Sequence, residues 1–268
     1  MLRLLIVLLL CSSLNGGEIH CKHFFHGMPK GAPDSNDLII RDCYSLSNNS
    51  EKKFADWVAY KLTAHETEPL LDLKRDWHSD PWLDESETLE PKPDAVDDYN
   101  GIGDTGYDRG HMAPLASFKG SRYASQVNFY SNITPQKVAL NRGPWSYLEK
   151  RVREMVKKYG YVWVITGTLY EYESGQEKYL PNPTDEGDVL IPSAFWKVVS
   201  IQPRKSTNSI KVAGFIFEQN TERNSPIENH VVTVKEIQVR TGLDLFNKLP
   251  ESLQATLENN IDAAWVTE

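Results

Sequence analysis

The sequence predicts a single α+β domain with a mixed or antiparallel sheet core and flanking helices. Apolar runs with the spacing of strands recur along the chain, and one strong amphipathic helix stands between them. No internal repeat and no linker separates two cores. The length of 268 residues agrees with this interpretation, because one large domain can use most of the chain.

The first half of the domain is expected to hold one long strand and much loop. Residues 17–50 contain several Gly and Pro residues and a turn-like Asn-Asn-Ser run, so irregular structure is expected there. Residues 54–62 alternate apolar and polar side chains and predict a strand. Residues 63–106, rich in Asp, Glu, Pro and Gly, predict loop, and residues 107–135 predict short strands and turns.

The second half begins with the strongest helical pattern in the chain. Pro144 stands where proline is tolerated at the start of a helix, and Gly160 is a natural stop. The apolar residues between them recur at helical spacing: Trp145, Leu148, Val152, Met155, Val156 and Tyr159. Strands are predicted at 161–166, 195–201 and 211–217, and a weaker helical pattern covers 234–246.

Residues 1–16 have the layout of a secretory signal peptide. Arg3 gives a positive start, Leu4 to Leu10 are unbroken apolar residues, and small residues follow. This run is shorter than the roughly 20 apolar residues that span a bilayer. Cleavage is therefore expected to release residues 17–268 as a secreted or periplasmic domain without stable membrane association. An uncleaved membrane anchor is the alternative.

The cysteines suggest one disulfide bond. Of the three, Cys11 falls within the predicted signal peptide, which leaves Cys21 and Cys43. An even pair in an exported chain predicts a disulfide that closes an N-terminal loop, since export leads to an oxidising compartment. Two free thiols are the alternative.

Charge is segregated along the chain. The formal net charge of −8 taken alone argues against a nucleic-acid partner. Residues 80–108, however, contain ten acidic residues and one basic residue, whereas residues 109–153 contain eight basic residues and one acidic residue. The acidic run is expected to be a solvated face. The basic run predicts a local cationic surface that can bind phosphates while the whole protein stays acidic.

The basic run contains residues suited to proton transfer and phosphate binding. In Asp108-Arg109-Gly110-His111, a His stands two positions after an Arg. A His side chain can move a proton near neutral pH, and an Arg can neutralise a phosphate or a transition state. A structural or surface His is the alternative for such a short run.

Asn141 and Glu149 form a second group of candidate residues. The Asn carbonyl oxygen, water and a substrate phosphate can complete the oxygen octahedron that Mg²⁺ prefers. Glu149 lies eight residues later, about two helical turns on, and can reach the water shell of such an ion. The alternatives are a helix N-cap for Asn141 and a surface pair with Arg153 for Glu149.

Three runs in this order and spacing resemble the DNA/RNA non-specific endonuclease family. They are Asp108-Arg109-Gly110-His111, Ser131-Asn132-Ile133-Thr134-Pro135-Gln136 and Leu140-Asn141-Arg142-Gly143-Pro144-Trp145. The resemblance extends from about residue 54 to about residue 250 and includes the segment that begins at Arg75. Arg142 departs from the glutamine expected in the family. The resemblance implies the ββα-metal fold and cleavage of both DNA and RNA.

The resemblance also implies a role for each matching residue. His111 would be the base that activates water, and Asn141 the direct ligand of Mg²⁺, for which Mn²⁺ can substitute. Glu149 would hold metal-bound waters. Arg109 and Arg75 would contact phosphate, with Arg75 in a flanking loop of variable length. Asn132 would form hydrogen bonds near the base and orient the site.

The implied reaction is in-line attack of water on phosphorus, which leaves 5′-phosphate ends. Because binding through phosphates carries no sequence information, little sequence specificity is expected. Two other functions remain open. One is a nucleic-acid-binding protein that has lost catalysis on the same scaffold. The other is a narrower phosphodiesterase for structured DNA, or a toxin-like effector with an inhibitor.

Overall fold

The computed structural model describes residues 18–91, 97–99, 102–180, 189–203 and 209–268. The predicted signal peptide, residues 1–16, lies outside the described residues. Within these ranges, no helix has the length and apolar character needed to cross a bilayer.

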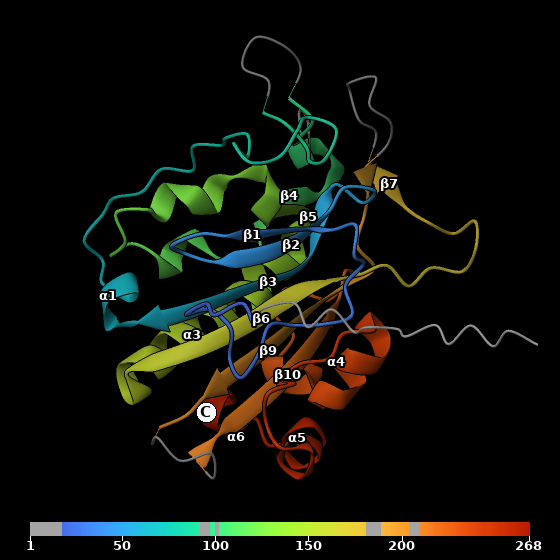
Figure 1. Cartoon of the computed structure of the whole chain (residues 1–268). Helices are drawn as coiled ribbons and strands as arrows, with labels where there is room; N and C mark the ends of the chain where they lie inside the picture. The colour runs from blue at the N-terminus through green and yellow to red at the C-terminus, as the bar shows by residue number, and fades with distance from the viewer. Residues whose placement is uncertain (1–17, 92–96, 100–101, 181–188, 204–208) are drawn as a thin grey trace, which may run out of the picture.

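A seven-stranded antiparallel sheet runs through the centre of the molecule (Figure 1). Its strands, in spatial order, are β1 (Asp37–Ile40), β2 (Ser45–Asn49), β3 (Phe54–Thr63), β6 (Tyr161–Leu169), β9 (Ala194–Ile201), β10 (Lys211–Glu218) and β11 (Val231–Val232). In the register of the central strands, Lys197 of β9 lies opposite Thr166 of β6 and Phe215 of β10.

The sheet is buried on both faces, so its central strands carry apolar residues at nearly every position. Successive side chains point to opposite faces, which divides the apolar residues between two cores. One core packs against α3 (Ser146–Tyr159). The other packs against α4 (Val234–Thr241), α5 (Glu251–Glu258) and the N-terminal segment, from which Phe25 enters the core.

A smaller ββα unit lies beside α3. Strands β4 (Tyr107–His111) and β5 (Ile133–Lys137) pair antiparallel, with His111 opposite Ile133. The chain then continues through α2 (Val138–Leu140) and a π-helical turn (Asn141–Trp145) into α3. This connection places the end of one strand and the start of a helix close together.

The remaining elements are short. They are α1 (Ala64–Thr67), α6 (Ala264–Thr267), the pair β7 (Tyr179–Leu180) and β8 (Val189–Leu190), and 3-10 turns at Ile102–Thr105, Leu115–Ser117, Ala124–Asn128, Tyr130–Asn132 and Ile227–His230. Helix α1 begins with a capping box in which Thr63 and Glu66 bond to each other's backbone.

The prediction of irregular structure for residues 17–50 was wrong in its second half, where β1 and β2 form. Asn48 and Asn49 are buried strand residues whose side-chain nitrogens donate hydrogen bonds to other segments. Asn48 donates to Glu87 O at 2.9 Å, and Asn49 donates to Asp56 at 3.0 Å. The bond of Asn48 joins residues 39 positions apart, and tertiary contacts of this kind override the turn preference of Asn.

The predicted disulfide between Cys21 and Cys43 is not formed, and both thiols are free. The Cys21 thiol lies 3.3 Å from Ser45 Oγ, whereas the Cys43 thiol donates to Tyr123 O at 3.4 Å. Burial raises the pKa of Cys43 to about 11. Each thiol is therefore engaged with a different part of the fold.

The expectation that the acidic run is a solvated face was also wrong for several of its residues. Asp80, Glu90 and Asp98 are buried. Asp80 forms an ion pair with the buried Arg41, and Ser131 Oγ donates to the same carboxylate. These bonds fasten the acidic segment to the sheet and to the ββα unit.

Candidate active site

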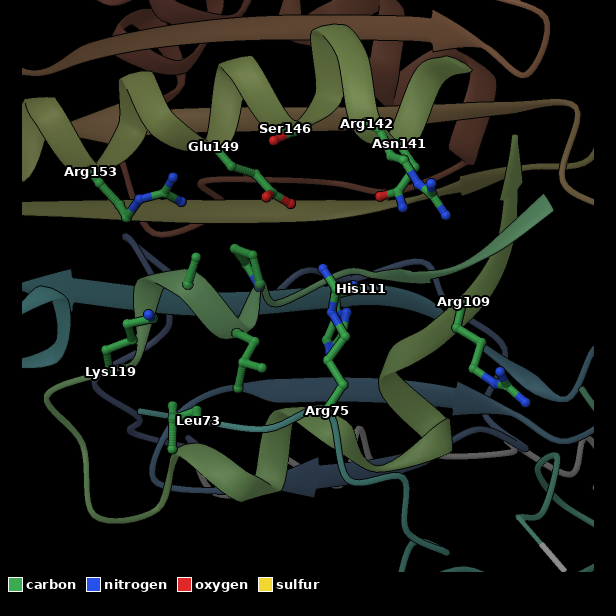
Figure 2. A pocket seen from close by; sticks show the side chains of 13 residues that line it. Leu73, Arg75, Arg109, His111, Lys119, Asn141, Arg142, Ser146, Glu149 and Arg153 are labelled. Atoms are coloured by element: carbon green, nitrogen blue, oxygen red, sulfur yellow. The ribbon is translucent and has the colours of Figure 1, made fainter. Parts of the chain in front are cut away.

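A pocket of about 460 Å³ lies between α3 and the segments opposite it. It is lined by Arg75, Arg109, His111, Asn141 and Glu149 together with Leu73, Pro114, Leu115, Ala116, Lys119, Arg142, Ser146 and Arg153. Figure 2 shows Asn141 and Glu149 descending from the helical side toward His111 and Arg75. The structure therefore brings five of the six predicted site residues together.

His111 is held by Asn128, which the sequence did not single out. The Asn128 Nδ2 group donates to Lys74 O at 3.1 Å, which turns its Oδ1 toward the imidazole. His111 Nε2 lies 3.0 Å from that oxygen. An amide oxygen can only accept, so Nε2 carries the proton and Nδ1 keeps a free lone pair. The arrangement leaves His111 able to accept a proton through Nδ1.

The surroundings of His111 favour its neutral form. The side chain is buried, and the Trp77 ring packs against it with the ring centres 5.3 Å apart. Burial, together with the positive charge of Arg75, lowers the pKa of His111 to about 4, although the bond to Asn128 opposes the shift. His111 is thus a neutral proton acceptor at physiological pH.

Asn141 is oriented by Asp108, the first residue of the run that contains His111. Asn141 Nδ2 donates to Asp108 Oδ2 at 2.9 Å, which leaves the amide oxygen directed elsewhere. Arg142 binds both oxygens of the same carboxylate, at 2.8 and 2.6 Å. Burial raises the pKa of Asp108, but these hydrogen bonds outweigh burial and hold it below its usual value. The N-cap alternative for Asn141 was wrong, because its backbone is helical.

The π-helical turn that carries Asn141 depends on Gly143. Gly143 interrupts the helical backbone with φ −116° and ψ −120°. A Cβ atom built on Gly143 would lie 2.4 Å from Arg223 O, closer than atoms can approach. A side chain at this position would therefore push apart the segment around Arg223 and the turn that carries Asn141.

Glu149 lies one helical turn into α3, with its carboxylate directed into the pocket (Figure 2). Burial raises its pKa above the ordinary value, whereas Lys197, Arg153 and Arg75 attract the charged form. The expected alternative of a surface pair with Arg153 is not formed. Arg153 instead donates to Ser117 Oγ at 3.3 Å.

The two predicted phosphate-binding arginines have different surroundings. Arg75 is exposed, and Figure 2 shows its guanidinium beside His111. Arg109 is held in a cage, in which it donates to Asp97, to Tyr130 Oη and to Tyr99 O at 3.1 to 3.2 Å. Arg75 is free to meet a phosphate, whereas Arg109 would have to share its donors with Asp97.

Asn132 is the predicted site residue that does not line the pocket. It is fully buried, and its amide accepts from Ala113 N at 2.8 Å and donates to Ala113 O and Val127 O. These bonds fasten the chain just after His111 to the turn that ends at Asn128. Asn132 therefore lies behind the base and out of reach of a substrate.

The sequence did not single out Asn128, and it did not show that Asp108 contacts Asn141. Asn128 stands between Val127 and Phe129, where an isolated Asn has the same local pattern as any turn residue. Its link to His111 spans 17 positions and exists only through the fold. Asp108 was part of the recognised run, but no local spacing connects it to Asn141, 33 positions later.

Comparisons with known proteins show which family the chain resembles. A family model described as DNA/RNA non-specific endonuclease matches residues 26–252. A nuclease of Serratia marcescens is 40% identical over 236 residues, which cover 87% of this chain and 83% of the relative. Nuclease C1 of Cunninghamella echinulata var. echinulata is 30% identical over 223 residues, which cover 81% and 86% respectively.

A chain in the crystal structure of the EndoG/EndoGI complex has a similar fold. The TM-score is 0.67 at 24% identity, with 85% of this chain and 91% of the other covered. This likeness confirms the predicted α+β architecture of the ββα-metal type. With the family match covering most of its length, the chain belongs to the DNA/RNA non-specific endonuclease family.

Proposed function

We propose that this chain is an exported, metal-dependent enzyme that hydrolyses DNA and RNA with little sequence preference and leaves 5′-phosphate ends. Residues 17–268 act as one catalytic domain in this proposal. The observation that carries it is the pocket itself, where a neutral His111 faces the oxygen-bearing side chains of Asn141 and Glu149.

His111 acts as the general base in this proposal. Asn128 holds the Nε2 proton, so Nδ1 takes the proton of the attacking water. Arg75 stabilises the negative charge that develops on the phosphate, and Arg109 adds to this once it shares its donors with Asp97. Asn132 keeps the base in place from behind.

The residues of the pocket fit a divalent cation. Asn141 offers an amide oxygen, because Asp108 binds its nitrogen, and Glu149 offers a carboxylate that reaches the ion through water. In the described part of the chain no three His, Cys, Asp or Glu side chains converge on one point, so solvent and substrate oxygens would complete the shell. Mg²⁺, or Mn²⁺ in its place, would polarise the phosphate and stabilise the departing 3′ oxygen.

The proposed substrate range follows from what the pocket contacts. Its rim carries Arg75, Lys119, Arg142 and Arg153, all suited to phosphates. The attack needs no 2′-hydroxyl group, so DNA and RNA both serve as substrates. A nucleic acid bound through its backbone is cleaved with little regard for sequence.

Digestion of plasmid DNA and total RNA by the purified protein tests this function. Mg²⁺-dependent loss of both substrates is expected, with EDTA and His111→Ala each abolishing it. Intact nucleic acid with every divalent ion would favour the binding-protein alternative. Cleavage restricted to nicked or structured DNA would favour the narrower phosphodiesterase. N-terminal sequencing of the protein collected from the medium or periplasm tests export separately, since a retained Met1 would contradict it.

A further inference from the structure

Lys197 is a charged residue at a position where the sheet requires an apolar one. It lies in β9 between Phe195 and Val199, which point into the core that packs against α3. Lys197 is fully buried, with 0% of its surface exposed. Lysine is almost never fully buried without a partner, so this position calls for a physical explanation.

The Lys197 ammonium has few partners that could replace its hydration. Nζ donates to Thr166 Oγ1 at the long distance of 3.4 Å, and it lies 4.0 Å from the centre of the Trp145 ring. Thr166 Oγ1 gives its own proton to Trp196 O at 2.7 Å, so it can accept from Lys197. Among the residues that the structure describes, no carboxylate lies within 4.0 Å of this ammonium.

Fold stability gives no reason for a lysine at this position. A buried charge loses its hydration, and contacts with a ring and one hydroxyl replace only part of it. An apolar residue of similar volume is often neutral or stabilising at such sites. A buried charged residue in an otherwise apolar strand is expected mainly where function requires it.

The ammonium is placed to act on Glu149. The Trp145 ring that covers it belongs to the turn that carries Asn141, and Glu149 follows Trp145 by four positions, one turn along the same side of the helix. Burial raises the pKa of Glu149, and Lys197 opposes this shift more than Arg153 and Arg75 do. Burial lowers the pKa of Lys197, and the charge of Glu149 opposes this shift.

We propose that Lys197 is a positioning residue of the active site, whose buried ammonium beneath Trp145 attracts the Glu149 carboxylate from outside the pocket and so supports a divalent cation at Asn141. The inference rests on the proposed function, because it assigns Lys197 to the metal site described above. It adds a residue that lies outside the pocket and that no motif identified.

Mn²⁺ binding without nucleic acid tests the inference apart from catalysis. Free Mn²⁺ is counted by electron paramagnetic resonance as it is titrated into wild-type protein and into Lys197→Met. The substitution is expected to weaken Mn²⁺ affinity by about 10-fold, the lower end of the usual effect of residues behind the ligands. The melting temperature of Lys197→Met should stay equal or rise, because a buried charge is replaced by an apolar side chain.

A double-mutant cycle shows whether Lys197 acts through Glu149. Glu149→Gln alone is expected to weaken Mn²⁺ binding, and adding Lys197→Met should then cause no further loss. Val199→Ala is the matched control on the same face of β9. It should lower the melting temperature through a cavity while leaving Mn²⁺ affinity unchanged.

Thr166→Val provides a second variant if Lys197→Met does not fold. It removes the only hydroxyl that accepts from Lys197 in the described residues and should weaken Mn²⁺ binding several-fold, again only when Glu149 is present. Equal Mn²⁺ affinity in wild type and in these variants, or equal losses with and without Glu149, would overturn the inference. A wild-type protein that binds no Mn²⁺ would instead overturn the metal site of the proposed function.

Discussion

At the scale of single residues, Asn128 determines which nitrogen of His111 can accept a proton. Its amide is oriented by Lys74 O, and that orientation places an acceptor against Nε2. A histidine in a pocket can otherwise adopt either tautomer, of which only one leaves Nδ1 available. Through these two hydrogen bonds, the Lys74 carbonyl group determines which nitrogen of His111 carries the proton.

Asn128→Ala is expected to lower kcat/KM by about 10- to 100-fold, because the imidazole loses the acceptor that fixes its tautomer and its orientation. Asn128→Asp keeps an acceptor and should retain more activity at neutral pH. Initial rates on a defined duplex measure both effects. An Asn128→Ala enzyme as active as wild type would exclude this role for Asn128.

The lowered pKa of His111 predicts an unusual tolerance of acid. The base works in its neutral form, and a lowered pKa keeps it neutral as the pH falls, so activity should persist well below the ordinary value of 6.5. Arg75→Gln removes a charge that disfavours the imidazolium ion and should move the acid limb of kcat/KM upward. A wild-type acid limb at or above pH 6.5 would contradict the burial argument.

The sequence identified the candidate catalytic and metal-binding residues, but it did not identify the residues that orient their side chains. His111, Asn141 and Glu149 occur in runs whose residue types suggest their chemistry, and the pocket contains all three. Asn128 and Lys197 have no such local signal. Lys197 was included in a predicted strand as one more residue, because only the fold shows that its side chain points inward.

At the scale of elements, the turn between α2 and α3 is the part of the ββα unit most sensitive to change. Gly143 has a non-helical backbone and marks a kink between two helical segments, so Pro144, which was predicted to open the helix, stands directly after the kink. The same glycine packs against Arg223 O. Gly143 therefore affects both the path of the chain and the segment that brings Asn141 to the pocket.

Gly143→Ala is expected to lower kcat by on the order of 100-fold, because the added methyl group must displace Asn141 or the segment around Arg223. Gly160→Ala is the matched control at the other end of α3. Gly160 has φ +86° and open space around it, so alanine there should cost about 1 to 2 kcal/mol of stability and leave activity intact. Equal activity of the two variants would contradict the proposed importance of the turn.

The strands of the sheet were predicted where apolar runs are long, and β3, β6, β9 and β10 confirm those predictions within a few residues. Strands β1 and β2 were not predicted. Asn48 of β2 donates to the backbone of Glu87, 39 positions later, and no local pattern reveals such a contact. Helix α4 ends at Gly242, short of the predicted limit, because Gly242 adopts φ +74° and closes the helix.

At the scale of the whole molecule, the chain combines an acidic total charge with a cationic pocket. Part of the acidic run is used internally, as in the buried pair of Asp80 with Arg41 and the contact of Asp97 with Arg109. The pocket rim keeps Arg75 and Lys119 available. Binding of nucleic acid should therefore depend on local charge and not on the net charge of −8.

Binding of a labelled duplex to the His111→Ala protein should weaken steeply between about 50 and about 200 mM salt, because phosphate contacts release counterions. Lys119→Gln should reduce the slope of log K against log salt by about 1. Lys235 is exposed on α4, which packs against the opposite face of the sheet, so Lys235→Gln should leave the slope unchanged. Affinity insensitive to salt would contradict binding through phosphates.

The N-terminal segment that covers the second core also constrains the order in which the protein can fold. Asn247 donates to Met28 O at 2.7 Å across 219 positions, and Lys30 and Asp244 exchange backbone hydrogen bonds beside it. A growing chain cannot form these contacts until nearly all of it has been synthesised. One face of the sheet therefore stays uncovered throughout synthesis, and long-range contacts of this kind make folding slow. The nascent chain would thus keep its aromatic surface open to chaperones until its last segment emerges.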